Sequence, residues 1–255
     1  MMRDLGIYLA IVVTLIIPAT TQEHQGDKYG SKDATGVVIL TRTLAAAHLT
    51  GVSNTSVIEG WGNIQYRWAG KQVNVPVYAK SAADTGLVLK ASLANGAWQL
   101  AIGSSIATIQ DASDVGRTIP TTATAVMKYA IPFVGMSNAI SDPTVSIIRP
   151  DQLELDGHQF VRVHAQSVAR ETNESARIVS KLSGVDIFID PLTWLVIGIQ
   201  GTTHDQRDIK DQYPDSIYFA DYRSVNGSFL PFTISERLAG QLVWTIRFKS
   251  VRLTR

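Results

Sequence analysis

The sequence contains no cysteine. This absence excludes disulfide bonds, thiol nucleophiles and thiolate metal sites, and it leaves no cysteine to carry a lipid behind an export signal. The sequence also lacks clusters of lysine and arginine, and its formal net charge is +1. Because nucleic-acid binding needs a basic patch, the charge distribution gives no support to that class of function.

Common catalytic motifs are absent as well. The chain has no G-x-S-x-G nucleophile elbow, no glycine-rich phosphate loop, no dinucleotide fingerprint and no H-E-x-x-H pair. Two carboxylate pairs, Asp111 with Asp114 and Asp205 with Asp208, fall in polar stretches that are typical of solvated loops. We therefore expect no enzyme activity, no catalytic residue and no cofactor. A hydrolase with an unrecognised site remains open as a third alternative.

The histidines do not form a metal-binding pattern. His158 and His164 fall on the same face of one expected strand. Six residues of extended chain place them about 20 Å apart, so these two side chains cannot bind one ion together. We expect no metal site from sequence spacing, and a site assembled from distant residues remains open.

The N-terminus is typical of an export signal. Arg3 supplies a basic start, and residues 7–17 are apolar apart from one threonine. We expect cleavage after Ala19, or alternatively after Thr21, and a mature protein that is periplasmic or secreted. A membrane anchor is the rival interpretation, but the run is shorter than the roughly 20 residues of a spanning helix. Residues 20–32 are polar, and we expect them to be flexible.

Strand patterns joined by turn signals fill the last third of the chain, from Val185 to Thr254. Proline cannot extend a ladder, and Asn-Gly tolerates the positive φ angles of a two-residue hairpin. The predicted turns are therefore Asp190-Pro191, Asn226-Gly227 and Ala239-Gly240.

The final strand has a change of parity. Apolar residues occupy every second position at Leu242, Trp244, Ile246 and Phe248, and these four side chains are predicted to share a face. Val251 and Leu253 fall on the opposite parity. This change predicts either a β-bulge or a frayed strand end.

Earlier segments predict a helix followed by an antiparallel meander. Apolar residues at helical spacing predict a helix over residues 32–49 that ends at Gly51. Residues 170–181 are polar and fit either a short helix or a loop. Alternating patterns predict strands over residues 55–68, 73–80, 85–93, 98–102, 105–109, 144–148, 152–155 and 158–167.

Residues 120–141 interrupt the strand pattern. They are apolar almost all round, and helices of that kind are buried on more than one side. Because proline breaks a helix interior, we predict two short helices with a break near Pro132.

Three features resemble the C-terminal half of the outer-membrane lipoprotein carrier (LolA-like) family. They are the run Ile189-Asp190-Pro191-Leu192-Thr193-Trp194-Leu195, the run from Asp221 to Gly227 that leads to Leu230-Pro231, and the closing strand with Trp244 and Ile246. The resemblance rests on sequence motifs over residues 185–255. Before residue 185 it rests only on the order of the predicted helices and strands.

This resemblance implies a single, mainly β domain over residues 33–255. Its antiparallel curved sheet forms a half-barrel of about 11 strands. The N-terminal helix and a lid at about residues 120–141 cover the concave side. Family carriers have an arginine that faces the lid. Arg42 and Arg67 are candidates, but neither lies in a matching motif, so no functional residue is carried over.

A curved sheet covered by short apolar helices leaves a cavity for flexible chains. Ordinary core packing is the alternative role for each lining candidate. We expect a monomeric carrier that holds the acyl chains of a lipid or lipoprotein, passes them on, and meets a partner in the inner or outer membrane. A sensor or protein-interaction module on the same fold is the alternative function. The candidate lining residues are Trp61, Trp68, Trp98, Met127, Phe133 and Met136.

Overall fold

The structure is a computed structural model. It describes residues 30–50, 56–68, 70–82, 86–93, 96–102, 106–110, 117–120, 125–155, 157–168, 174–204 and 212–254. The expected signal peptide and its cleavage site lie outside these residues, as do residues 20–29 of the expected flexible segment.

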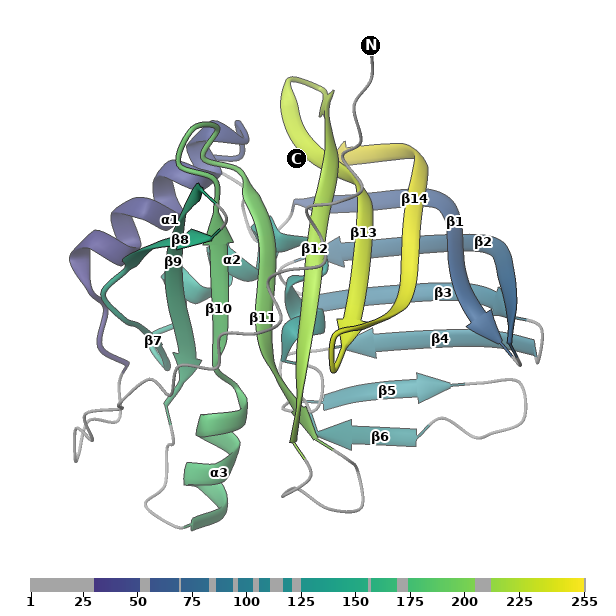
Figure 1. The fold of residues 1–255 in the computed structure, drawn as a ribbon, viewed down its shortest axis with the longest axis horizontal. Coiled ribbons are helices and arrows are strands. Elements are labelled where there is room, and N and C mark those ends of the chain that lie inside the picture. Colours follow the sequence, from purple (N-terminus) through teal and green to yellow (C-terminus); the bar gives the residue numbers. More distant parts are fainter. Residues whose placement is uncertain are drawn as a thin grey trace.

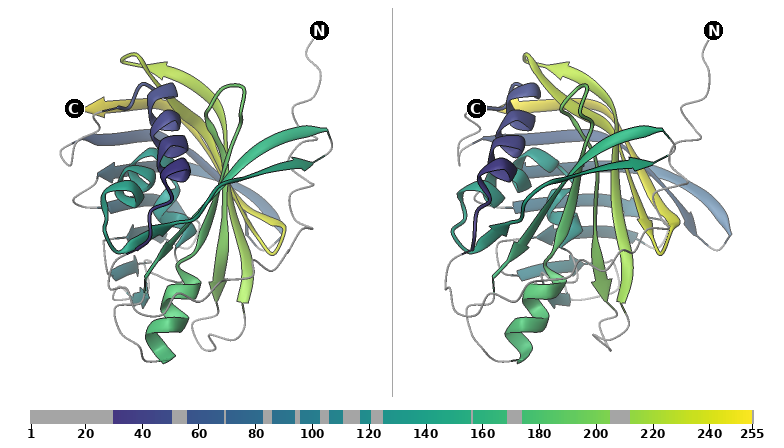
Figure 2. Two further views of the ribbon diagram at one scale, coloured as in Figure 1. Left: turned by 90° about the vertical axis from the view of Figure 1, so that its left-hand side faces the viewer. Right: turned by 60° about the vertical axis from the view of Figure 1, so that its left-hand side comes forward.

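Fourteen antiparallel strands form one open sheet within the described ranges. Their order is β6-β5-β4-β3-β2-β1-β14-β13-β12-β11-β10-β9-β7, and β8 also pairs with β9. The sheet curls around one side without closing, which confirms the predicted half-barrel (Figures 1 and 2). The strands are β1 (Val57–Trp68), β2 (Lys71–Ala82), β3 (Gly86–Leu93), β4 (Gly96–Ile102), β5 (Ile106–Gln110), β6 (Arg117–Pro120), β7 (Val145–Ile147), β8 (Asp151–Leu155), β9 (His158–Ser167), β10 (Val185–Ile189), β11 (Val196–His204), β12 (Gln212–Val225), β13 (Ser228–Leu238) and β14 (Gln241–Thr254).

Short helices accompany the sheet. The helix α1 (Ala34–Ala46), the 3-10 helix η3 (Val126–Tyr129) and α2 (Pro132–Ser141) lie on its concave side, while α3 (Glu174–Leu182) lies at its lower end (Figure 2). We call η3 and α2 together the lid. α3 settles the open choice in favour of a helix over residues 174–181, and residues 170–173 lie outside the described ranges.

The first helix is shorter than the sequence predicts. Asp33 begins α1 as its N-cap, since its carboxylate accepts a hydrogen bond of 2.9 Å from the Gly36 amide. The helix ends at Ala46, and His48 then adopts a left-handed φ of 56°. The predicted stop at Gly51 lies outside the described residues.

The predicted turns are confirmed in the C-terminal meander. Asn226 and Gly227 have φ angles of 51° and 81°, and Ala239 and Gly240 have 48° and 79°, as two-residue hairpins require. At the Asp190-Pro191 turn, the Asp190 carboxylate accepts hydrogen bonds from the Leu192 amide at 3.0 Å and the Thr193 hydroxyl at 2.7 Å. These bonds satisfy polar groups that no strand pairs.

Two register shifts shape β14. Trp61 pairs with Ser250 and Gly62 with Phe248, so Lys249 is an extra residue in the ladder and the predicted bulge is confirmed. A second shift lies between Glu236, which pairs with Trp244, and Arg237, which pairs with Leu242, so Val243 is the extra residue. Leu242 pairs with Arg237 and is 53% exposed. The prediction that it shares the buried face of Trp244 is therefore wrong.

The segment before α1 is fastened to the end of the lid. The Gly30 amide donates to Pro143 O at 2.7 Å, and Ser31 O accepts from the Ile147 amide at 2.8 Å. Lys32 Nζ donates to the carbonyls of Ala139 and Asp142 at the C-terminus of α2, where a cation is favourable. These bonds hold residues 30–32 next to α2, and the flexibility expected of residues 20–32 stays a prediction.

Candidate functional site: the apolar concave face and its lid

The lid consists of two short helices that pack against each other. Pro132 occupies the first turn of α2, where its missing amide proton is tolerated, and it separates α2 from η3 as predicted. A Cβ on Gly135 would lie 2.5 Å from Cδ1 of Tyr129. Only glycine therefore lets the Tyr129 ring lie against α2.

Three predicted lining residues lie in this lid and are buried. Phe133 and Met136 are 0% exposed and Met127 is 6% exposed. The Phe133 ring meets Tyr222 of β12 edge to face, with centroids 6.4 Å apart. These residues therefore line the contact between the lid and the sheet. Their role in holding a ligand stays a prediction.

The predicted tryptophans have a different outcome. Trp61 is 39% exposed, and its ring lies 5.5 Å from the Tyr78 ring and 5.4 Å from the Arg252 guanidinium carbon. It shares the parity of Glu59, whose carboxylate accepts a hydrogen bond from Tyr78. The structure therefore places Trp61 apart from the buried lid residues, and its ligand role stays a prediction. The side chains of Trp68 and Trp98 lie outside the described part of the chain.

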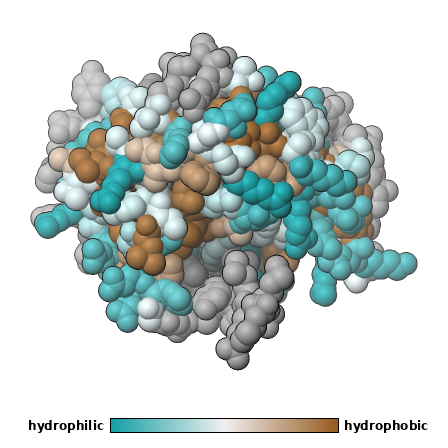
Figure 3. Space-filling view, turned by 90° about the horizontal axis from the view of Figure 1, so that it is seen from above, coloured by the Kyte–Doolittle hydropathy of each residue, from teal (hydrophilic) through white to brown (hydrophobic). Residues whose placement is uncertain are grey.

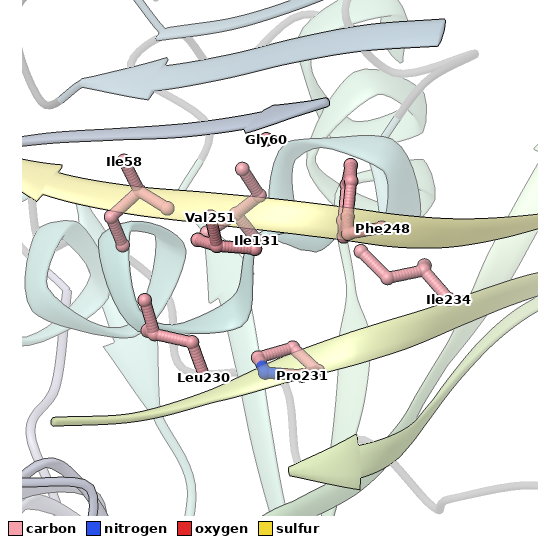
Figure 4. A pocket seen from close by; sticks show the side chains of 8 residues that line it. All are labelled: Ile58, Gly60, Ile131, Leu230, Pro231, Ile234, Phe248 and Val251. Atoms are coloured by element: carbon pink, nitrogen blue, oxygen red, sulfur yellow. The ribbon is translucent and has the colours of Figure 1, made fainter. Parts of the chain in front are cut away.

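The space between sheet and lid is filled by side chains. Figure 4 shows apolar residues of β1, β13 and β14 converging on Ile131, which precedes α2. The cavity among them measures only about 10 Å³, too little for more than a single water molecule. An acyl chain can enter this region only if the lid moves. The lining consists of Ile58, Gly60, Ile131, Leu230, Pro231, Ile234, Phe248 and Val251.

Side-chain packing holds the lid to the sheet. In the described part of the chain, no backbone hydrogen bond joins residues 126–141 to a strand, and Lys32 Nζ, outside the sheet, donates to Ala139 O. Phe133 packs on Tyr222, whose hydroxyl donates to Val196 O at 2.6 Å. Burial raises the pKa of Tyr222, so it stays neutral. No ladder bond needs to break for the lid to separate.

Sequence reasoning missed the role of Tyr222. By strict alternation, Asp221 would follow Ile217 and Phe219 onto the buried face. Instead Asp221 adopts a φ of 55° and forms a bidentate ion pair with Arg223, with distances of 3.0 and 2.6 Å. Tyr222 then packs against the core. The signal is an Asp at an inward position, a residue type that tolerates left-handed backbone.

The two candidate arginines contact no lid residue in the interactions that the structure describes. The Arg42 guanidinium of α1 lies 3.7 Å from the centroid of the Trp194 ring. This stacking fastens α1 to the Asp190-Pro191 turn. Arg67 is exposed on β1.

Other chemistry is sparse in the described ranges. They hold no group of three or more histidine, aspartate or glutamate side chains that could bind a metal ion. His164 Nδ1 lies 2.8 Å from the Asp186 carboxylate. The carboxylate pairs at residues 111–114 and 205–208 lie outside these ranges. No described helix has the length and apolar character to cross a membrane.

The outer surface offers one shallow alternative to the lidded face. A groove of about 200 Å³ is lined by Asn63, Gln65, Asn74, Arg247, Phe248 and Lys249. It lies beside the bulge at Lys249, and the Arg247 guanidinium donates to Gln65 Oε1 at 3.0 Å. Viewed from above, hydrophobic and hydrophilic residues are interspersed over the surface (Figure 3).

Comparisons with known proteins support the fold. No family model matches the sequence, and no curated protein matches it. A lipoprotein-sorting protein domain from Vibrio parahaemolyticus superposes with a TM-score of 0.53 at 11% identity, over 86% of this chain and 92% of that one. A DUF1329 family protein from Desulfovibrio piger gives 0.52 at 10%, over 86% and 91% of the two chains. A LolA superfamily protein from Nitrosomonas europaea gives 0.51 at 9%, over 85% and 94%. The chain therefore has the fold of the LolA and lipoprotein-sorting superfamily.

Proposed function

We propose that this protein is an exported, periplasmic carrier that holds the acyl chains of a lipid or lipoprotein between the concave sheet and the lid, and then passes them on. One observation carries the proposal. The lid is apolar on several sides, yet within the described residues only side chains join it to the strands. Such a lid can leave the sheet and return without disturbing the ladder.

The energetics of exchange support reversible binding. Burying an acyl chain stabilises the complex by about 0.8 kcal/mol per methylene. Opening the lid first exposes Met127, Phe133 and Met136 to water. The free energy of exposing these apolar side chains opposes binding. Because one apolar contact replaces another, a loaded carrier can release its cargo to an acceptor with a larger apolar site.

The filled interior favours one alternative. A cavity of about 10 Å³ is also what a protein-interaction module or sensor on this fold would have, since such a module needs no ligand space. The two functions differ in whether the lid must move. The decisive experiment therefore controls lid movement.

A disulfide between lid and sheet provides that control. A Cβ on Gly201 of β11 would lie 2.6 Å from Val126 Cγ2 of η3. Cysteines at both positions have Cβ atoms within the roughly 4 Å that a disulfide requires. The chain has no other cysteine, so Val126→Cys with Gly201→Cys forms a single intramolecular bridge. Each single variant serves as a control.

Uptake of a fluorescent fatty-acid probe is then measured before and after reduction of the same sample. We expect no uptake in the oxidised protein, and uptake in the reduced protein and in both controls. Equal uptake in both redox states would show that the lid does not admit the ligand. No uptake by any form, with no lipid on the purified protein in native mass spectrometry, would favour the interaction module.

A further inference from the structure

Two carboxyl groups face the concave side of the sheet near its lower end. Asp215 of β12 pairs with Gly201 of β11, and a Cβ on Gly201 would touch Val126 of η3. Asp215 therefore points to the lid side. Glu236 of β13 pairs with Ile217, two residues along β12 from Asp215. The two carboxyl groups are thus diagonal neighbours on one face.

Asp215 lacks a partner that its charge requires. It is 4% exposed, and its Oδ1 has no hydrogen-bond partner. No lysine or arginine in the described part of the chain pairs with it or with Glu236. Arg237 points to the opposite face and donates to Gly240 O at 3.1 Å, and Lys128 of η3 interacts with Asp142 instead. A buried carboxylate without a cation is unfavourable.

The surroundings of the pair fit an organic cation. The Trp244 side chain, 8% exposed, forms a hydrogen bond with Glu236, and Tyr66 lies opposite Trp244 in the ladder. Aromatic faces attract ammonium groups. A calcium ion would instead need six or more oxygen ligands, and the described residues hold no third acidic or histidine ligand here.

An apolar rim adjoins the two acids. Leu238 lies directly opposite Asp215 and is 37% exposed, and Tyr213, two residues before Asp215 on the same face, is 41% exposed. On the inner side Ile217 is 0% exposed. An ammonium group held here would therefore have the partly exposed rim on its outer side and apolar residues on its inner side, where the hydrocarbon chain of an amphiphile can lie.

We propose that Asp215 and Glu236 form a subsite for the ammonium group of a cationic amphiphile whose hydrocarbon chain lies on the concave face. This inference rests on the proposed carrier function and specifies the class of its cargo. The ammonium group donates to the free oxygen of Asp215 and to the Glu236 carboxylate, and the chain replaces lid side chains.

The ionisation of the pair agrees with this geometry. Burial raises the pKa of Asp215 to about 6. Burial and the neighbouring charge of Asp215 raise the pKa of Glu236 to about 8. A bound ammonium group lowers both pKa values, so binding near neutral pH releases protons. The preference for a cation increases as the pH rises.

The test compares three probes of equal chain length: decylamine, 1-decanol and decanoate. Binding is followed by intrinsic tryptophan fluorescence and calorimetry in the purified full-length mature protein. The measured quantity is the ratio of decylamine affinity to decanol affinity, since lid opening affects both probes alike. We expect wild type to prefer decylamine at least tenfold at pH 8. The ratio falls toward one at pH 5 and in the Asp215→Asn, Glu236→Gln double variant.

Each other outcome has a definite meaning. A wild-type ratio near one, a preference for decanoate, or an unchanged ratio in the double variant overturns the ammonium subsite and leaves the carrier function standing. Failure of all three probes to bind wild type overturns both proposals. If the double variant does not fold, Glu236→Gln alone and the pH series on wild type decide the question.

Discussion

Truncation of Phe133 is the most direct test of the lid. Phe133 is 0% exposed and contacts Tyr222 across the boundary between lid and sheet. A buried Phe→Ala substitution costs about 3–5 kcal/mol. In a domain of this size each kcal/mol lowers Tm by about 2–4 °C. For Phe133→Ala we expect Tm to fall by about 6–20 °C if lid and sheet unfold together.

Ligand affinity should change in the opposite direction. The lost contacts belong to the closed lid, so the substitution raises the population of the open, binding-competent state. Each 1.4 kcal/mol is worth a factor of ten. If the closed lid bears half of the lost energy, about 1.5–2.5 kcal/mol, a fatty-acid probe binds roughly 10- to 60-fold tighter to Phe133→Ala than to wild type, despite the lower Tm.

A matched control separates lid loosening from general destabilisation. Phe232 is 7% exposed, its ring lies 4.5 Å from the Arg223 guanidinium carbon, and no described aromatic contact joins it to a lid residue. Phe232→Ala should lower Tm comparably without tightening the probe. The same affinity change in both variants, or weaker binding by Phe133→Ala alone, would refute the reasoning.

Three further predictions concern the lid and the acidic pair. Met136→Asp should abolish probe uptake while the β-rich circular dichroism spectrum persists, because a carboxylate then faces the acyl site. Gly135→Ala should lower Tm by several degrees, whereas Ser137→Ala should not, since a Cβ at position 135 collides with Tyr129. Glu236 takes up a proton on folding because burial raises its pKa to about 8. Urea unfolding should therefore show stability falling between pH 5 and 8, with a shallower slope in Glu236→Gln.

Local signals in the sequence predicted much of the fold. Asn226-Gly227 specified a hairpin through its backbone preferences, and Pro132 specified the helix break through its missing amide proton. Both effects depend on one or two neighbouring residues. The parity change before Val251 also located a bulge, because alternation on a half-buried strand reports the face directly.

Features set by distant partners were not predicted. The exposure of Leu242 follows from a register shift against β13, which nothing within β14 specifies. The strand β6 was missed because its four residues are too few to show alternation. The filled cavity depends on how the lid packs, and no local pattern encodes that.

The acidic pair was missed for a related reason. Asp215 and Glu236 are far apart in sequence, and only the register of β12 with β13 makes them neighbours. A signal exists in each strand by itself. Asp215 shares the parity of Ile217, and Glu236 that of Ile234, although those positions are otherwise buried and apolar. An acid at an inward position deserves to be treated as a candidate site.

The acidic pair and the lid are linked energetically. Asp215 lies on the side of the sheet that η3 covers, and this burial raises its pKa. Closing the lid makes the ionisation of Asp215 less favourable. By linkage, the ionisation of Asp215 makes the closed lid less favourable by the same free energy. Raising the pH through 6 therefore favours the open state, even for an uncharged ligand. Uptake of 1-decanol should be faster at pH 8 than at pH 5, and Asp215→Asn should remove the difference. Equal rates in wild type would mean that the lid opens without exposing Asp215.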